Sequence, residues 1–163
     1  MNKTNQRLRI RRATRSDVEE LKKLYYGTIV TICSRDYTPL QIDAWAATAE
    51  KTESLIKRIE EQFFFVALDQ TDIIVGFTSI DASGYLDLMY VHKDHQRKGI
   101  AQSLFNEIMK TANELGITEM ESEVSITAKP FFKKNGFVVI ESQLIQINNT
   151  ELVNFKMKRR LEN

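Results

Sequence analysis

One segment of the chain, residues 85–115, constrains the fold more than any other. It begins as an apolar strand from Tyr85 to Val91, continues as a short basic loop, and then shows the apolar spacing of a helix from Ile100 to Leu115. The first turn of a helix leaves backbone N–H groups unpaired and carries partial positive charge. The segment therefore predicts an anion site, and a diphosphate is the ligand that we expect there.

The loop between this strand and helix is rich in positive charge. Gly99 removes a side chain where a ligand would approach the backbone, and Asp94 is the one acid in the loop. Its basic residues are His92, Lys93, His95, Arg97 and Lys98. Because Gly99 is followed by Ile100 and Ala101, the lysine and hydroxyl of a Walker loop are missing, and a single glycine does not make a Rossmann fingerprint. Nucleoside triphosphates and dinucleotides are therefore not the expected ligands.

The segment resembles motif A of the GNAT superfamily of N-acetyltransferases. The signature of that motif is Gln/Arg-x-x-Gly-x-Gly/Ala, which stands here as Gln96-Arg97-Lys98-Gly99-Ile100-Ala101. The resemblance extends upstream to Met89-Tyr90-Val91. Downstream it includes Ser125-Ile126-Thr127-Ala128 and the run FFKKNGF at residues 131–137, which looks like the family's motif B. Together these motifs cover roughly residues 73 to 137 in the family's order.

Hydrophobic periodicity outside this segment predicts further helices and strands. Alternation predicts strands at residues 7–11, 63–68, 73–80, 118–124, 138–147 and 152–157, and helical spacing predicts helices from Ser16 or Asp17, from Thr38 to about Ala49, at 52–62 and before Gly136. The helical crossover from Val91 to Thr118 favours parallel neighbours, whereas the hairpins impose antiparallel ones. We expect one α/β domain over residues 1–163, GNAT-like, with a mixed and mostly antiparallel central sheet that is splayed in the middle and flanked by helices.

The resemblance implies that the protein binds acetyl-CoA as an acetyl donor. Backbone amides of residues 96–101 would hold the pyrophosphate with Gln102 at its edge, and the backbone of Met89 and Val91 would pair with the pantetheine arm and polarise the thioester carbonyl. The implied cofactor-binding residues are Met89, Tyr90, Val91, Gln96, Arg97, Lys98, Gly99, Ile100, Ala101, Gln102, Ser125 and Phe132. No metal-ligand spacing accompanies the two histidines, so no metal is expected.

The resemblance also implies direct transfer of the acetyl group to a primary amine, of a small molecule or of a protein. Such a reaction needs an aligned amine, a base and a way to protonate the leaving thiolate. Asp87, on the motif A strand, is the first candidate base and Glu123 is the second, although Asp87 could equally be an exposed strand residue. Phe132 stands where many family members have a tyrosine as general acid. Water, Tyr37 or Tyr90 could replace it, or CoA could leave as the thiolate.

Several other residues have two interpretations. His92 and His95 could act as bases, but two histidines in a basic loop favour solvated charge that attracts phosphates. Cys33 fits a packed small side chain better than a nucleophile. In the family, the region between the first helices forms a wall of the acceptor site, so the candidate substrate-binding residues are Arg35, Asp36, Tyr37 and Trp45.

Composition limits the partners and the compartment that we expect. A net charge of +1 gives no general attraction to nucleic acid. No apolar run approaches the roughly 18 residues of a membrane span, and the basic N-terminus lacks a signal core, so a cytoplasmic protein without a membrane partner is expected. The single cysteine fits a reducing compartment. Two alternatives stay open: a homodimer through the C-terminal hairpin, and a catalytically silent module that binds or senses acyl-CoA.

Overall fold

Two antiparallel sheets and five α-helices make up the protein in the computed structural model, which describes residues 7–162. Residues 1–6, the start of the basic N-terminal segment, and residue 163 lie outside the described residues. In chain order the elements are β1 (Arg9–Arg12), η1 (Arg15–Asp17), α1 (Val18–Thr31), η2 (Cys33–Arg35), α2 (Pro39–Ala46), η3 (Ala47–Glu50), α3 (Thr52–Glu61), β2 (Phe63–Leu68), β3 (Ile74–Ile80), β4 (Leu86–Val91), α4 (Ile100–Glu114), β5 (Glu119–Ser125), α5 (Lys129–Lys134), β6 (Val138–Ile147) and β7 (Thr150–Arg160).

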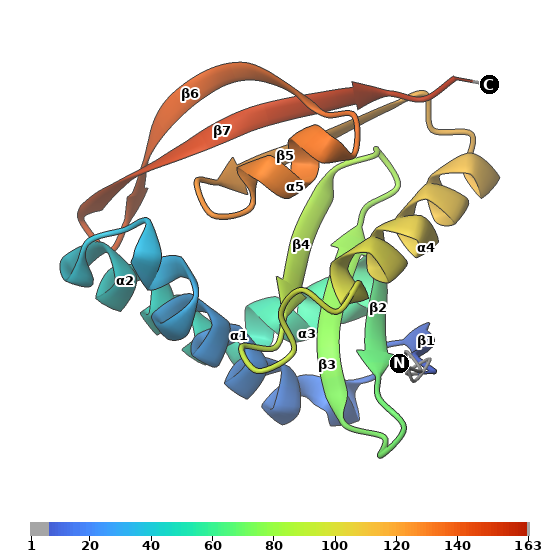
Figure 1. Ribbon diagram of the computed structural model, residues 1–163, viewed down its shortest axis with the longest axis horizontal. Coiled ribbons are helices and arrows are strands. Elements are labelled where there is room, and N and C mark those ends of the chain that lie inside the picture. Colours follow the sequence, from blue (N-terminus) through green and yellow to red (C-terminus); the bar gives the residue numbers. More distant parts are fainter. Residues whose placement is uncertain (1–6, 163) are drawn as a thin grey trace, which may run out of the picture.

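The two sheets meet at one end and separate at the other. Their strand orders are β1-β2-β3-β4 and β5-β7-β6, and a parallel bridge between Tyr85 and Glu121 connects them. Beside this bridge, the Ser122 hydroxyl donates to the Leu86 carbonyl at 2.7 Å. From there β4 and β5 diverge toward their C-terminal ends (Figure 1). The predicted mixed, mostly antiparallel sheet that splays in the middle is therefore confirmed.

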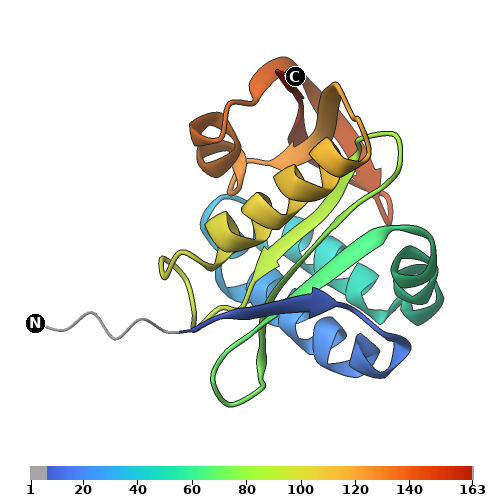
Figure 2. The same cartoon turned by 90° about the vertical axis from the view of Figure 1, so that its right-hand side faces the viewer.

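Helices cover both faces of the first sheet. Helix α4 lies on one face and α1 with α3 on the other (Figure 2). Leu104 and Ile108 of α4 are fully buried, as is Leu21 of α1, because the apolar stripe of each helix faces the strands. None of the helices within residues 7–162 has the length and apolar character that crossing a membrane requires.

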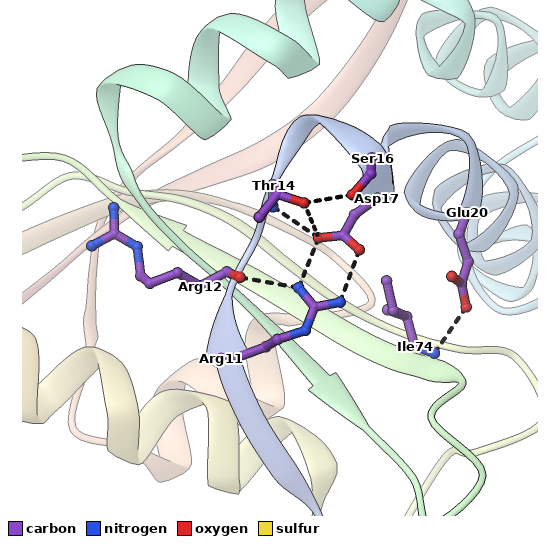
Figure 3. Close-up of polar contacts among 7 residues, drawn as sticks. All are labelled: Arg11, Arg12, Thr14, Ser16, Asp17, Glu20 and Ile74. Carbon is purple, nitrogen blue, oxygen red and sulfur yellow. Dashed lines mark hydrogen bonds and ion pairs between the residues drawn. The ribbon is translucent and has the colours of Figure 1, made fainter.

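An ion pair joins β1 to the start of α1 (Figure 3). The Arg11 guanidinium donates two parallel hydrogen bonds of 2.9 Å to the Asp17 carboxylate, which also accepts one of 2.8 Å from the Thr14 backbone. Asp17 is 6% exposed, and the hydrogen bonds from Arg11 hold the pKa of its carboxyl group below the ordinary value. Asp17 occupies the expected N-cap position of α1, but its carboxylate makes no cap hydrogen bond to that helix and instead ties the preceding strand to it.

Local sequence signals correspond closely to the elements that form. Thr38 and Gln41 make the capping box expected at α2: the Thr38 N–H donates to Gln41 Oε1 at 2.9 Å and the Gln41 N–H to Thr38 Oγ1 at 3.3 Å. Helix α2 ends at Ala46 and continues as the 3₁₀ turn η3, so the predicted end near Ala49 merges two elements. The helical spacing that begins at Ile100 predicts that Leu115 faces inward, but α4 ends at Glu114 and Leu115 is 42% exposed.

Candidate active site

The loop before α4 presents an open helix N-terminus. Gly99 immediately precedes the helix with φ +80°, and a Cβ atom built there would meet no atom within 4 Å. The Gln96 side chain donates to the Val91 carbonyl at 2.8 Å and to the His92 carbonyl at 3.3 Å. It therefore fixes the loop to the end of β4, and the backbone amides at the helix start remain free to meet an anion.

Strand β4 has backbone groups that its neighbour does not use. The His92 N–H donates to the Val75 carbonyl at 2.8 Å, and Val91 and Met89 lie opposite Gly76 and Thr78. In an antiparallel ladder this makes both of them non-hydrogen-bonded positions, so their N–H and C=O groups point away from β3. The Val91 carbonyl accepts from the Thr28 hydroxyl at 2.8 Å as well as from Gln96. The Val91 N–H and both groups of Met89 are left facing the gap beside β5.

A cleft of about 980 Å³ occupies the gap between the two sheets. It extends from the loop before α4, past the divergent ends of β4 and β5, to α1, α2 and the β6–β7 hairpin. The predicted residues that line it are Asp87, Met89, Tyr90, Val91, Gln96, Arg97, Gly99, Ile100, Ala101, Gln102, Glu123, Ser125, Phe132, Tyr37 and Trp45. Lys98, Arg35 and Asp36 are exposed and do not line the cleft. Asp36 instead accepts a hydrogen bond of 2.8 Å from the Thr127 hydroxyl.

A bulge in β4 determines the direction of Asp87. Ser79 pairs with Leu88 and Ile80 with Leu86, so Asp87 has no partner on β3 and the strand's alternation is interrupted there. Its carboxylate accepts hydrogen bonds from Arg58 Nε at 2.7 Å and Gln62 Nε2 at 2.9 Å, both on α3. Asp87 therefore borders the cleft with its charge already paired, and its side chain is 15% exposed.

Glu123 is an exposed acid on the opposite wall. Within residues 7–162 its side chain forms no ion pair or hydrogen bond. Tyr85, a lining residue that the sequence did not suggest, lies near it: burial, followed by the charges of Glu123 and Asp87, raises the pKa of Tyr85 to about 12. The phenol is therefore protonated at neutral pH. Glu123 lies opposite Lys156 in the β5–β7 ladder, but the Lys156 ammonium pairs with Glu121 at 3.2 Å, so the Glu123 carboxylate has no direct ion pair among the described residues.

The positions expected to contact the donor's sulfur are partly structural. Phe132 is 3% exposed, and its ring packs at 5.0 Å from the ring of Phe137 in the core beneath the cleft. The Ser125 hydroxyl accepts from the Ala128 N–H at 3.0 Å, just before α5. The Tyr37 hydroxyl donates to the Val153 carbonyl at 2.7 Å and accepts from the Ile126 N–H at 2.9 Å. Tyr37 thus joins η2 to the second sheet, and its proton is committed to Val153.

Comparison with known proteins agrees with this geometry. The family described as acetyltransferase (GNAT) domain matches residues 33–159. The chain belongs to the GNAT acetyltransferase family. The uncharacterized N-acetyltransferase YafP of Escherichia coli K12 is 28% identical to this GNAT protein over 151 residues, which are 93% of this chain and 95% of YafP.

Solved structures share the fold of this GNAT acetyltransferase. A GCN5-related N-acetyltransferase from Rhodopseudomonas palustris superposes with a TM-score of 0.89 at 25% identity, with 99% of each chain covered. The PaiA N-acetyltransferase of Thermoplasma acidophilum, solved in complex with coenzyme A, has a TM-score of 0.77 at 21% identity and covers 95% of this chain and 99% of its own. The splayed sheet is therefore shared with known acetyltransferases.

His95 and Cys33 of the GNAT protein lie in surroundings that disfavour their charged forms. Burial, then the neighbouring His92 and Lys98, lowers the pKa of His95, whose ring lies 5.0 Å from that of His92. At neutral pH His95 is therefore largely uncharged, so it does not add the positive charge expected from the sequence. Burial raises the pKa of the Cys33 thiol to about 11, which agrees with a packed side chain rather than a nucleophile.

Several residues that line the GNAT site were not predicted from the sequence, because they follow the hydrophobic spacing of buried core residues. Thr28, which holds the Val91 carbonyl, lies on an α1 stripe that helical spacing assigns to the interior. Ile145, Ile147 and Leu152 alternate as buried hairpin residues would. They reach the cleft only because the second sheet turns away from the first. Lys134, two residues after Phe132, is a further lining residue, and its place in the FFKKNGF motif was the available signal.

Proposed function

We propose that this GNAT acetyltransferase transfers the acetyl group of acetyl-CoA directly to a primary amine. The observation that carries the proposal is the continuity between the unused backbone groups of Met89 and Val91 and the open N-terminus of α4, which lie along one cleft. An extended amide-containing arm can pair with the first, and a diphosphate can bind at the second. The coenzyme A complex of PaiA, which has the same fold, supports this assignment.

The residues present fit such a donor. Gly99 leaves open space beside the helix start, and Arg97 and Lys134 add positive charge along the lining of the cleft. We assign the diphosphate to the backbone of residues 96–101, with Lys98 at the exposed rim, and the amide-containing arm to Met89 and Val91. Tyr90, Gln102, Ser125 and Phe132 border this path. Acetyl-CoA, when bound, supplies an acetyl group activated as a thioester, so the protein mainly has to align an uncharged amine.

Glu123 is the base that the structure favours. An amine gives up a proton as its nitrogen forms the amide bond, and Glu123 is a cleft carboxylate without a direct ion pair among the described residues, whereas Asp87 is engaged by Arg58 and Gln62. We propose that Glu123 accepts this proton and that Asp87 positions Arg58. Because Phe132 has no hydroxyl and the Tyr37 proton is committed to Val153, we assign no protein proton donor to the leaving sulfur.

Calorimetric titration of acetyl-CoA tests the donor site with two variants of one residue. Gly99→Ala and Gly99→Glu share the cost of a side chain at φ +80°, about 1 kcal/mol, but only glutamate places bulk and negative charge beside the helix start. We expect micromolar binding to the native protein, a small loss in Gly99→Ala and no detectable binding in Gly99→Glu. Equal affinity in all three folded proteins would remove the donor site from this loop.

The assignment of the base is tested by pH profiles of kcat. For Glu123→Gln we expect kcat to fall roughly 10²-fold, with loss of the decline that the native enzyme shows as pH falls through the pKa of its base. For Asp87→Asn we expect a raised amine KM with that decline retained. If Asp87→Asn removed the decline and Glu123→Gln retained it, Asp87 would be the base.

Binding of acetyl-CoA without release of CoA for any amine would instead favour the silent acyl-CoA-binding module, which the phenylalanine at position 132 keeps open.

A further inference from the structure

The end of the cleft remote from the loop before α4 is lined mainly by apolar side chains. We call it the acceptor chamber and define it by the lining residues Ile32, Trp45, Tyr90, Ile145, Ile147 and Leu152. They come from the end of α1, from α2, from β4 and from the β6–β7 hairpin. The hairpin turn lies beside α2, and β4 lies nearer the centre of the molecule (Figure 1). Branched aliphatic side chains and aromatic rings therefore form most of the surface that a bound acceptor would touch, and Asn154, which also lines the cleft, adds an amide whose Oδ1 has no hydrogen-bond partner among the described residues.

The aromatic side chains of the wall pack against one another. The Tyr25 hydroxyl hydrogen-bonds with Thr48 Oγ1 at 3.2 Å, and Thr48 in turn donates to the Trp45 carbonyl at 2.6 Å. The ring of Tyr90 lies edge-on to Tyr25 at 4.5 Å, and burial raises its pKa well above the ordinary value. The wall therefore presents aromatic ring surface to a ligand.

The charges around the chamber do not suit an acceptor with several positive groups. Among the described residues that line the cleft, the carboxylates are Asp87 and Glu123, and Asp87 is paired with Arg58. Lys22 and Lys51 also line the cleft, where Lys22 pairs with the exposed carboxylates of Glu19 and Glu50 at 3.7 and 3.6 Å. A polyamine or an aminoglycoside would place additional ammonium groups against apolar or positive surface, where an unpaired charge is costly.

We propose that the acceptor is a monoamine whose amine is attached to one aromatic or branched aliphatic group. This inference rests on the proposed function and names its substrate class. The apolar group occupies the acceptor chamber, while the nitrogen points toward the free backbone of β4 and toward Glu123. Each buried methylene contributes about 0.8 kcal/mol to such binding, so a group of several carbons gives a substantial preference.

Release of CoA, detected as free thiol, tests this class with matched amines. Phenethylamine and isoamylamine are compared with methylamine, putrescine, spermidine and kanamycin. We expect kcat/KM for the two apolar monoamines to exceed that for every other amine by at least about tenfold. A higher kcat/KM for spermidine, putrescine or kanamycin would overturn the inference. So would equal values for phenethylamine and methylamine.

Two adjacent residues of β6 provide a matched pair of variants. Ile145 lines the chamber, whereas Leu144 is 65% exposed on the other face of the hairpin. We expect Ile145→Ala to raise KM for phenethylamine about tenfold with little change in kcat, and Leu144→Ala to leave both unchanged. Ile145→Asp should shift the preference toward putrescine, because it places a carboxylate where a second ammonium would lie. Equal kinetics for the two alanine variants would contradict the chamber.

Calorimetry with acetyl-CoA and the CoA-release assay together separate a failure of this inference from a failure of the proposed function. If acetyl-CoA binds and an amine outside the proposed class gives the highest kcat/KM, the acceptor class is wrong while the proposed function stands. If acetyl-CoA does not bind, or if it binds and no amine releases CoA, the proposed function has failed, and the acceptor class falls with it.

Discussion

Burial determines what Cys33 can do, although its thiol borders the cleft. The side chain is 4% exposed and the pKa of the thiol is raised to about 11, because burial disfavours the charged thiolate. At neutral pH the reactive form is therefore scarce. The same argument keeps the phenols of Tyr85 and Tyr90 protonated, since the pKa of each is raised as well.

Cys33 should react slowly with thiol reagents in the native protein. Denatured protein is allowed to react completely with a disulfide reagent at pH 8, and in the same time we expect less than a tenth of the native thiol to react. The reaction rate of the native protein should rise as pH approaches 11. A double variant, Cys33→Ser with Ser34→Cys, moves the thiol to an exposed neighbour and should react quickly. If the folded wild-type protein and the folded double variant reacted at comparable rates, the Cys33 thiol would be open to solvent.

Residue identity predicts backbone roles better than side-chain directions. Motif A predicted a loop and a helix start directly after Gly99, and the structure confirms this position, because an unpaired helix start depends on the backbone and on the absence of a side chain. Asp87 could not be placed in the same way, because the bulge in β4 breaks the alternation from which its direction would be inferred. Its partners Arg58 and Gln62 lie on α3, far away in sequence.

At the scale of an element, the turn between β6 and β7 shows what a local sequence signal can predict. Ile147 pairs with Thr150, so a two-residue loop connects β6 and β7, and both of its residues have positive φ, +47° at Asn148 and +62° at Asn149. Asparagine tolerates this conformation, which matches the twist of a hairpin. The Asn-Asn pair therefore predicted the turn, whereas nothing local indicated that the hairpin would form a wall of the cleft.

Substitutions of Asn149 should separate backbone strain from contacts. Asn149→Ala keeps a Cβ atom at φ +62° but removes the side-chain amide that lets asparagine hydrogen-bond locally in this conformation. It should lower the free energy of unfolding by about 1 kcal/mol. Asn149→Gly should leave it unchanged or raise it by a few tenths of a kcal/mol. Urea denaturation followed by circular dichroism measures both. Greater loss in the glycine variant than in the alanine variant would mean that the asparagine side chain, not φ, sets the stability of the turn.

At the scale of the whole molecule, stability in acid should depend on the junction between β1 and α1. The hydrogen bonds from Arg11 lower the pKa of Asp17 below its ordinary 3.8. A carboxyl group with a lowered folded-state pKa stabilises the native state above the unfolded-state value and loses this contribution as pH falls through the folded-state value. The contribution is therefore present at neutral pH and declines as pH falls below about 4.

Asp17→Asn should lower the free energy of unfolding by about 2 kcal/mol at pH 7, and the difference from the native protein should shrink as pH falls below 4. Asp72→Asn is the matched control, since Asp72 pairs with Arg9 at 2.9 Å but its side chain is 72% exposed. It should change stability by less than about 0.5 kcal/mol. A difference between native and Asp17→Asn proteins that is constant from pH 7 to pH 3 would contradict the role of the carboxylate charge.

The bridge between Tyr85 and Glu121 connects two sheets that otherwise diverge. On one side of the opening lie β4 and the start of α4, and on the other the hairpin with its apolar side chains. Substitutions in the hairpin therefore leave the backbone of the opposite wall in place. On the proposed function, a gene encoding this fold can explore new acceptors by changing a few codons for residues 145–152 while the proposed donor site stays constant. Descendants of one ancestor can then diverge in substrate without first losing their source of acetyl groups.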